Sequence, residues 1–313
     1  MSSFEERTRP SLLQYRRPAD KTFVLTILIL LLAPLKSFAA SPMTYIYNAP
    51  ESRLDVRYLY HWEILKTALD RTKNKYGPYR LAPSEPMAEK RQTFELMNST
   101  GKLTVMYLST KPEFEQDLVP IRIPVDKNLG GYCIFLIRKE DQHKFDSIAT
   151  LDDLRKFTYG LGLGWVDVDI LKFNNFRVVT GSSYDGLFKM LINRRFDIFL
   201  RAVVEILDEY GQRKDAMPDL FIEKHVVFYY PLPMYFWFSK TEEGRHLAAR
   251  AEEGMRMMIE DGTYDRIFNK YQRYKILRLK LKERRIFRIE NPFLGPETPF
   301  EDKRLWFDPK TYH

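Results

Sequence analysis

Residues 181–206 have the sequence GSSYDGLFKMLINRRFDIFLRAVVEI, and this run is the most informative about the fold. Ser182 and Ser183 are favourable helix caps, and the apolar residues after them recur three and four positions apart. The predicted buried face of this helix consists of Tyr184, Leu187, Phe188, Leu191 and Ile192. After Arg194 and Arg195 the pattern changes to FDIFLRAVVEIL, which indicates a buried strand that leads into another helix. The run therefore predicts a helix, a strand and a second helix in direct succession.

The same alternation of strands and helices extends outward from this run in both directions. We expect strands at 43–48, 103–109, 158–163 and 177–180, helices at 57–70, 86–98, 151–156 and 242–260, and extended segments at 119–125, 132–138 and 225–240. The first two extended segments meet at the turn residues Asn128, Gly130 and Gly131. Alternation of this kind predicts an α/β fold with two mainly parallel sheets and flanking helices.

The pattern of elements restarts near Arg138 and returns near His225, so we expect two lobes that the chain links by crossing twice. The expected divisions are 1–39 as a signal peptide, 40–137 as the first part of lobe 1, 138–226 as lobe 2, 227–275 as the return to lobe 1 and 276–313 as a C-terminal extension. A cleft between two such lobes is a common place for a ligand.

The N-terminus has the features of a secretion signal. The apolar run TFVLTILILLLAPL at 22–35 has 14 residues and follows Arg16, Arg17 and Lys21. A membrane span needs roughly 20 apolar residues, and a shorter run is typical of a signal peptide. Ser37 and Ala39 fit the last positions before a cleavage site, so we expect cleavage near Ala39 and a periplasmic protein. The alternative is an uncleaved anchor, which also leaves the body outside the cytoplasm.

The charge of the chain is basic and locally concentrated. Fifty Lys and Arg residues exceed 42 Asp and Glu residues by 8, and the estimated pI is about 9.2. Seven basic residues lie between Lys275 and Arg288. A nucleic-acid site needs base-reading or stacking residues beside such a patch, whereas the neighbours here are Leu and Ile. We therefore expect no nucleic-acid partner, and a solvated helix face or attraction to an anionic membrane surface explains the patch.

The residues that carry enzyme chemistry are scattered. The single cysteine, Cys133, excludes an intrachain disulfide, and its apolar strand favours an inert buried thiol. No two of the five histidines have the spacing of a helical metal site, and there is no G-x-S-x-G motif. We therefore expect no catalytic residues, no metal and no cofactor, and we expect a monomeric binding protein.

Several stretches, together with their order, resemble the periplasmic solute-binding proteins of the amino-acid-binding family (family 3), and especially a divergent branch of that family. They are the run 181–206, DVRYLYHWEIL at 55–65, PIRIPVDKNLGGYCIFLIRK at 120–139 and RRIFRIENPFLGPETP at 284–299, the last being similar to the C-terminal extension of that branch. The resemblance covers most of 42–310. It implies the type II periplasmic-binding-protein fold, in which two lobes are joined by a two-stranded hinge.

The resemblance also implies where a ligand would bind. Family members carry Thr-x-x-Arg after the third strand of lobe 1, and this Arg pairs with the ligand carboxylate. The corresponding stretch here is Ser109-Thr110-Lys111-Pro112-Glu113-Phe114, which has no Arg. The family also places an acidic residue after the lobe-2 Asp to hold the amino group, whereas Arg201 and Ala202 follow Asp197 here. Both halves of the amino-acid clamp are altered, so a free α-amino acid is not the expected ligand.

The candidate ligand-binding residues are Arg201, Trp165, Tyr47, Thr110, Tyr132, Asp167, Glu205 and Tyr235. Arg201 follows a strand end, where it would meet either an anionic ligand or only Glu205. Trp165 opens a helix whose N–H groups suit an anion, while Asp167 can simply complement the helix dipole. The tyrosines stand at strand ends, where they would line the cleft or belong to the core.

We therefore expect an exported protein that closes by hinge motion on a small polar molecule, which can be anionic. Its partners would be that small-molecule ligand and a membrane importer or sensor. The alternative is a module that keeps the fold without small-molecule binding and serves as a protein-interaction or envelope accessory factor. An enzyme that uses carboxylates in the cleft is a third hypothesis.

Overall fold

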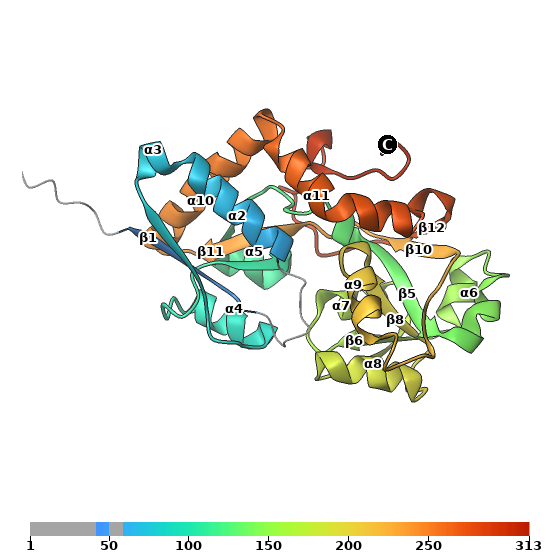
Figure 1. Ribbon diagram of the computed structural model, residues 1–313. Coiled ribbons are helices and arrows are strands. Elements are labelled where there is room, and N and C mark those ends of the chain that lie inside the picture. The colour runs from blue at the N-terminus through green and yellow to red at the C-terminus, as the bar shows by residue number, and fades with distance from the viewer. Residues whose placement is uncertain (1–41, 50–58, 313) are drawn as a thin grey trace, which may run out of the picture. The chain divides into compact units, whose positions relative to one another are not determined.

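The computed structural model describes residues 42–49 and 59–312 (Figure 1). The predicted signal peptide at 1–39 and the first residues of the helix predicted at 57–70 lie outside the described residues. Residues Pro42–His313 form one compact unit. Within the described ranges, no helix is long and apolar enough to cross a membrane.

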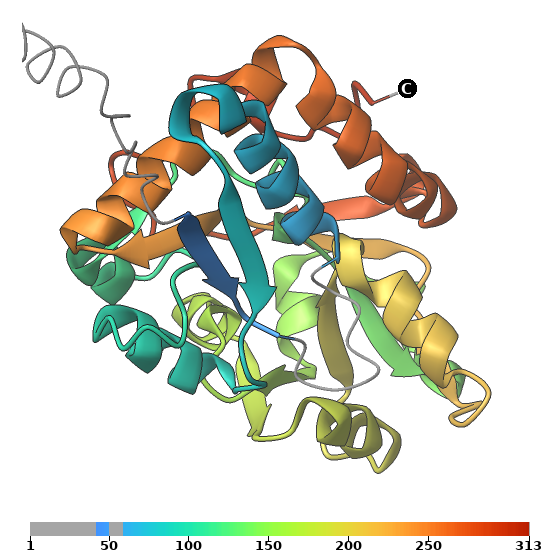
Figure 2. The same cartoon turned by 60° about the vertical axis from the view of Figure 1, so that its left-hand side comes forward.

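The first lobe contains two short sheets covered by helices. Its elements are β1 (Met43–Tyr47), α2 (Leu59–Arg71), α3 (Lys73–Tyr76), β2 (Tyr79–Pro83), α4 (Glu89–Met97), β3 (Met106–Ser109), α5 (Pro112–Asp117), β4 (Leu118–Pro120), β11 (Met234–Ser239), α10 (Glu242–Glu260) and α11 (Thr263–Arg278). Strands β1 and β2 pair in parallel (Figure 2), and a single bridge from Tyr47 to Val105 connects them to the sheet β3-β11-β4. Helix α10 crosses α2 closely, because Gly254 lies against the backbone of Ala68, where a Cβ atom would come within 2.0 Å of the Ala68 oxygen.

The second lobe contains one seven-stranded sheet in the order β12-β10-β5-β8-β6-β7, with β9 beside β5. Its elements are β5 (Tyr132–Arg138), η2 (Lys139–Phe145), α6 (Leu151–Arg155), β6 (Thr158–Gly162), α7 (Val166–Phe173), β7 (Arg177–Gly181), α8 (Tyr184–Ile192), β8 (Ile198–Ala202), α9 (Val203–Arg213), β9 (Leu220–Ile222) and β10 (Val226–Tyr229), and β12 (Arg285–Arg288) joins it from the C-terminal segment.

The predicted two-lobe α/β fold is confirmed, but in place of two mainly parallel sheets the described strands form three: β1-β2 is parallel, β3-β11-β4 is antiparallel, and the seven-stranded sheet is mixed. Strand β6 pairs in parallel with β7 and β8, as the alternating pattern predicted. Strands β5 and β11 pair antiparallel with all of their neighbours. Each of these strands follows directly after the chain crosses between the lobes: β5 is the first strand of lobe 2, and β11 is the strand on which the chain returns to lobe 1.

The run 181–206 forms α8, β8 and α9, as predicted. The Ser183 side chain accepts a hydrogen bond from the backbone N–H of Gly186 at 3.2 Å and so caps α8. The helix buries Leu187, Phe188 and Leu191 against the sheet. Local capping and apolar periodicity therefore agree with the tertiary packing of this segment.

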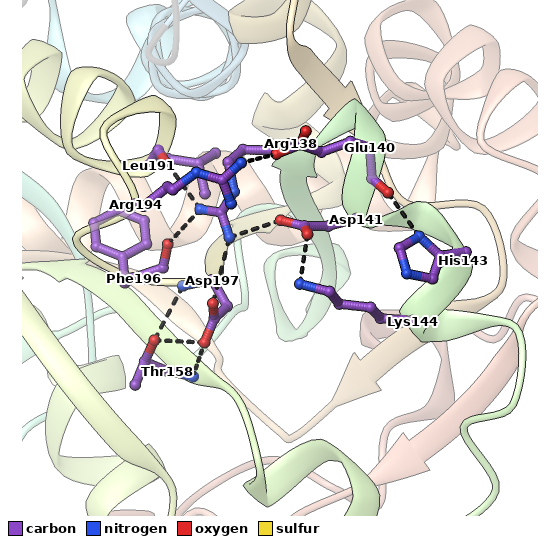
Figure 3. A network of polar contacts seen from close by, with 10 residues as sticks. All are labelled: Arg138, Glu140, Asp141, His143, Lys144, Thr158, Leu191, Arg194, Phe196 and Asp197. Atoms are coloured by element: carbon purple, nitrogen blue, oxygen red, sulfur yellow. Dashed lines mark hydrogen bonds and ion pairs between the residues drawn. The ribbon is translucent and has the colours of Figure 1, made fainter.

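A buried arginine holds the end of α8 to the start of β8 (Figure 3). Arg138 Nη1 donates to the carbonyl oxygens of Leu191 at 2.9 Å and Phe196 at 2.8 Å. Its Nη2 pairs with Asp141 at 2.6 Å and Asp197 at 3.3 Å. Asp197 in turn accepts hydrogen bonds from the backbone and side chain of Thr158, which begins β6. This network ties three neighbouring elements of the second lobe together.

Two chain crossings join the lobes before the end of α11, and a third passage leads from α11 to β12 of the lobe-2 sheet. By sheet membership, lobe 1 comprises 42–49, 59–120 and 234–278, lobe 2 comprises 132–229, and the crossings are 121–131 and 230–233. The crossings run beside each other, since the N–H of Val125 donates to the Met234 oxygen at 2.9 Å and the N–H of Tyr230 donates to the Gly131 oxygen at 3.1 Å. The remaining residues, 279–312, form the segment that we name the tail.

The largest apolar cluster includes residues from both lobes. It contains Ile64 of α2, Phe199 of β8 and Ile276 of α11. Beside it, Lys275 of α11 donates to the Val204 oxygen and to Asp208 of α9, each at 2.5 Å. Part of the basic run at 275–288 therefore contacts lobe 2 directly.

Candidate functional site

A cavity of about 110 Å³ lies between the two lobes. Lobe 1 and the crossings supply His61, Glu89, Tyr107, Leu108, Ser109, Asp126, Gly130, Leu232 and Met234, and lobe 2 supplies Cys133, Leu161, Trp165, Val166, Asp167, Leu200, Arg201, Ala202, Val204 and Glu205. An apolar cavity of about 150 Å³ in another protein holds benzene, so the cavity here accommodates a ligand of roughly that size or smaller. Its lining combines apolar walls with carboxylates, which suits a small molecule that carries polar groups.

Arg201, which the sequence predicted as a site residue, lies in the cavity wall near the end of β8. Its Nε donates to Glu209 at 2.7 Å, and its Nη2 donates to Glu205 at 2.7 Å and to Glu209 at 2.5 Å. Burial alone would lower the pKa of this guanidinium, but the two carboxylates outweigh burial and raise the pKa. Nη1 makes no hydrogen bond to a described residue.

The spacing of the sequence explains how this cluster forms. Glu205 and Glu209 are four residues apart on α9, so they share one face of the helix that begins directly after Arg201. The hydroxyl of Tyr184 on α8 also donates to Glu209, at 2.6 Å. The three charged side chains, Arg201, Glu205 and Glu209, together carry one negative charge, so the guanidinium is already compensated within the chain.

Trp165 forms an aromatic wall of the cavity. It is the N-cap residue of α7, and its ring lies against Gly162, where a Cβ atom would come within 2.3 Å of the indole. Only glycine at this position lets the indole lie flat against the end of β6. The ring is stacked with Phe199 at a centroid distance of 6.4 Å, and the guanidinium carbon of Arg201 lies 5.0 Å from the indole centroid.

Asp126 is a fully buried carboxyl in the first crossing. Its two oxygens accept hydrogen bonds from the backbone N–H groups of Asn128 at 3.0 Å and Gly130 at 2.8 Å. Burial raises its pKa to about 7, although those two hydrogen bonds oppose the shift, and Glu205 nearby raises it further. The cavity therefore contains an acid that changes its charge near neutral pH.

Asp167 reaches the cavity from the first turn of α7. It accepts a hydrogen bond from the hydroxyl of Tyr230, and that hydroxyl lies 3.4 Å from the sulfur of Cys133. Burial raises the pKa of the Cys133 thiol, and the charge of Asp167 adds to the effect. Cys133 is a free and buried cysteine beside the cavity, as its apolar strand predicted.

One lysine of lobe 1 reaches across to lobe 2 at the cavity. Lys111 Nζ pairs with Glu89 at 2.8 Å and donates to the carbonyl oxygen of Gly164 at 2.9 Å. Gly164 directly precedes Trp165 and the start of α7. This contact connects the two lobes at the place where Glu89 and Trp165 both line the cavity.

Comparison with known proteins identifies the architecture around this cavity. The sequence matches no protein-family model and no curated protein. Among solved structures, an ancestral arginine-binding protein bound to arginine has 18% identity, a TM-score of 0.52, and coverage of 73% of this chain and 98% of its own. The substrate-binding protein of an amino acid ABC transporter has 14% identity, a TM-score of 0.53, and coverage of 74% and 99%. The fold is that of the two-lobe periplasmic binding proteins.

A third structure agrees with these two. The substrate-binding protein of an amino acid ABC transporter from Streptococcus pneumoniae, bound to L-arginine, has 14% identity and a TM-score of 0.54, and it covers 74% of this chain and 94% of its own. These neighbours match about three quarters of the chain and nearly all of their own length. At such low identity the likeness establishes the fold, and the ligand has to be argued from the side chains of this cavity.

The structure brings four of the predicted site residues together and places the other four elsewhere. Arg201, Trp165, Asp167 and Glu205 all line the cavity. Of the others, Tyr47 packs on Trp62 with a centroid distance of 4.6 Å, and the Thr110 hydroxyl donates to Glu115 at 2.6 Å. Tyr132 and Tyr235 are buried in the core, as the alternative interpretation of the strand-end tyrosines held.

Several cavity residues were not singled out from the sequence. Asp126, Glu89 and His61 come from three segments far apart in the chain, so no local pattern connects them. Glu209 did have a local signal, because it repeats the four-residue step from Arg201 to Glu205. Among the described residues, no group of three or more His, Cys, Asp or Glu side chains is arranged to hold a metal ion.

Proposed function

We propose that this protein is a solute-binding protein that holds a small polar molecule between its two lobes. The observation that carries the proposal is the cavity itself, which both lobes line in a fold whose solved relatives are binding proteins. An interlobe position allows a ligand to contact both lobes at once, so binding stabilises the arrangement that surrounds it.

The charges of the cavity favour a ligand that carries a positive group. Asp167 and Asp126 present carboxyl groups to the cavity from lobe 2 and from the first crossing. Arg201 is compensated by two carboxylates, so it offers its Nη1 edge to a neutral acceptor such as a carbonyl or hydroxyl rather than to a full negative charge. The ligand class is thus a small amine with a neutral polar group, in place of the anion expected from Arg201 alone.

The same fold supports a proposal for the cellular role. Two of the solved relatives are described as substrate-binding proteins of amino acid ABC transporters. Together with the apolar run at 22–35, this supports an exported receptor that passes its ligand to a membrane importer or a sensor.

A thermal-shift screen of the purified protein tests the function. Its panel contains amines, amino alcohols, amino acids, organic acids and sugars. A ligand at 100 times its dissociation constant stabilises the fold by about 2.7 kcal/mol, which is a melting shift of several degrees. Hits confined to amines support the proposed class, and hits confined to organic acids contradict it. A panel without hits, after any copurified ligand is removed, favours the protein-interaction module.

A pair of variants on one helix places the ligand in the cavity. Asp167→Asn removes a lining charge, and we expect it to weaken amine binding at least tenfold, about 1.4 kcal/mol. Asp169→Asn is the matched control, because Asp169 also stands in the first turn of α7 but is exposed to solvent. Equal affinities of the two variants in calorimetry would show that the amine binds elsewhere.

A further inference from the structure

The tail, residues 279–312, is attached to lobe 2 at its beginning. Strand β12 pairs in parallel with β10 from Arg285 to Arg288 and so forms the edge of the lobe-2 sheet (Figure 1). Directly after β12, the backbone of Glu290 exchanges two hydrogen bonds with the side chain of Asn174, at the end of α7. The first part of the tail therefore moves with lobe 2.

The middle of the tail contacts both crossings. Asn291 Nδ2 donates to the carbonyl oxygen of Pro231 at 2.8 Å, in the second crossing. Glu297 accepts a hydrogen bond from Arg122 at 2.8 Å, and the N–H of Phe307 donates to the Lys127 oxygen at 2.7 Å, both in the first crossing. Two of these three contacts hold backbone carbonyl groups of the segments that connect the lobes.

The end of the tail is attached to lobe 1. The Phe307 ring is buried against Phe268 of α11 at a centroid distance of 6.1 Å. The hydroxyl of Tyr312 donates to Asn269 of the same helix at 2.6 Å, and Arg304 pairs with Glu260 of α10 at 2.9 Å. The carbonyl of Phe307 also accepts a hydrogen bond from Tyr132 of lobe 2 at 3.3 Å, so the same residue contacts both lobes.

We propose that the tail is a brace that fixes the two lobes in one relative arrangement, with or without a ligand. Opening a two-lobe protein requires the residues of its crossings to change their backbone angles and the lobes to rotate apart. A chain segment fixed to lobe 2 by strand pairing, to both crossings by hydrogen bonds and to lobe 1 by a buried ring resists both changes. The apolar cluster that includes residues of both lobes and the contact of Lys275 with α9 also oppose separation of the lobes.

The brace changes how a ligand is exchanged. The hinge motion expected from the sequence is replaced by entry of the ligand into a cavity that already exists between the lobes. Release of the tail from lobe 1 would restore hinge motion. This inference concerns the protein without ligand and stands apart from the ligand class proposed above.

Interlobe distances between spin labels test the brace. Labels are introduced through Lys90→Cys on α4 and Lys172→Cys on α7, both exposed, while the native Cys133 is buried. Without ligand, the braced protein gives one narrow distance distribution. The variant Asn291→Ala/Phe307→Ala removes a crossing contact and the lobe-1 anchor, and we expect a broader distribution with longer distances. Glu301→Ala, an exposed tail residue, is the control and keeps the narrow distribution.

If the double variant does not fold, proteolytic cleavage of the tail in the already folded protein provides a second test. A protease recognition sequence inserted between Pro296 and Glu297, both exposed, allows the folded protein to be cut between its lobe-2 and lobe-1 attachments. Broadening after cutting supports the brace. A distribution that is already broad in the intact protein, or that stays narrow in the folded double variant and after cutting, overturns it. Neither result depends on whether an amine binds, so the proposed function is judged separately.

Discussion

Two buried arginines stand at opposite ends of the same pair of strands. Arg138 ends β5 and contacts Asp197 just before β8, whereas Arg201 lies near the end of β8, opposite Ile134 of β5. At about 3.3 Å per residue, Arg201 is roughly 13 Å along the strand from Asp197. Both arginines are almost inaccessible to solvent, and each contacts two carboxylates.

Their remaining partners differ. Arg138 also donates to two backbone carbonyl groups, where α8 ends and β8 begins (Figure 3). Among the described residues, Arg201 donates hydrogen bonds only to Glu205 and Glu209 of α9, and it lines the cavity. Backbone acceptors at the end of a helix and just before a strand cannot follow a ligand, whereas carboxylates on a helix face can change partners. Burial and ion pairing alone therefore do not mark a binding residue, and the type of acceptor separates the structural arginine, Arg138, from the candidate binding one, Arg201.

The largest effect on stability is expected at Arg138, where β5 ends and β8 begins. Arg138→Met removes the buried cation that pairs with Asp141 and Asp197 and the side-chain donor to the Phe196 oxygen, while Lys144 still pairs with Asp141, so the free energy of unfolding should fall by about 3 kcal/mol. Urea denaturation measures the loss. Arg194→Met, in the same region but exposed and paired with Glu140, should cost less than about 1 kcal/mol. If both variants lose less than about 1 kcal/mol of unfolding free energy, Arg138 does not have the structural role assigned to it.

The second prediction concerns Arg201, near the end of β8 at the cavity. In Arg201→Met/Glu209→Gln the buried charge and its main partner are removed together, so the free energy of unfolding should change by less than about 1.5 kcal/mol. Amine affinity should nevertheless fall at least tenfold, because the cavity loses its Nη1 donor. Calorimetry and urea denaturation of the same preparation separate the two quantities.

A third buried arginine supplies the control. Arg213 ends α9, is buried over the Phe188 ring and pairs with Asp185, but it does not line the cavity. Arg213→Met should therefore lower stability and leave the affinity for the amine unchanged. If it weakens binding as much as the Arg201 variant does, the loss reflects a general loosening of α9, and Arg201 has no direct part in binding.

The contrast between these ends also limits what sequence reasoning could reach. Helix caps, apolar periodicity and the restart of the pattern near Arg138 are local features, and they predicted the run 181–206 and the two-lobe fold. The pairing of Arg201 with Glu205 was visible as a four-residue step. Asp126 and Glu89 could not be placed beside it, because only the crossings and the approach of lobe 1 bring them there. Tyrosines at strand ends have no local feature that distinguishes a cleft from a core.

The third prediction is that the two ends respond to pH with opposite sign. Burial tends to raise the pKa of Asp197, but hydrogen bonds from Thr158 and Arg138 outweigh it and lower the pKa, so its contribution to stability is lost as the pH falls. Asp126 has a folded pKa of about 7, above its unfolded value, so its contribution is present at acid pH and is lost as the pH rises toward and through 7. Denaturation curves between about pH 2 and 8 should therefore show Asp126→Asn gaining relative stability toward pH 8 and Asp197→Asn losing its sensitivity to acid below about pH 4.

The pH dependence of ligand affinity should come from Asp126, and Asp197 should not contribute to it. A cationic ligand prefers the charged carboxylate, so amine affinity should fall by up to about tenfold per pH unit below pH 7. Asp126→Asn should flatten this profile, while Asp167→Asn should weaken binding and keep the pH dependence. A flat profile in the native protein would show that the amine does not meet Asp126.

The smallest effect is expected where lobe 1 meets the cavity end of lobe 2. Lys111→Met removes the hydrogen bond to the Gly164 oxygen and the pair with Glu89, which should cost about 0.5–1.5 kcal/mol. Because the tail still holds the lobes, stopped-flow measurements should show ligand dissociation accelerated only a few fold, with the interlobe distance unchanged. Lys102→Met, an exposed lysine of lobe 1 that lies 3.7 Å from Glu95, is the control and should leave dissociation unaltered. A Lys111 variant whose lobes separate would show that this single contact, and not the tail, maintains the closed arrangement.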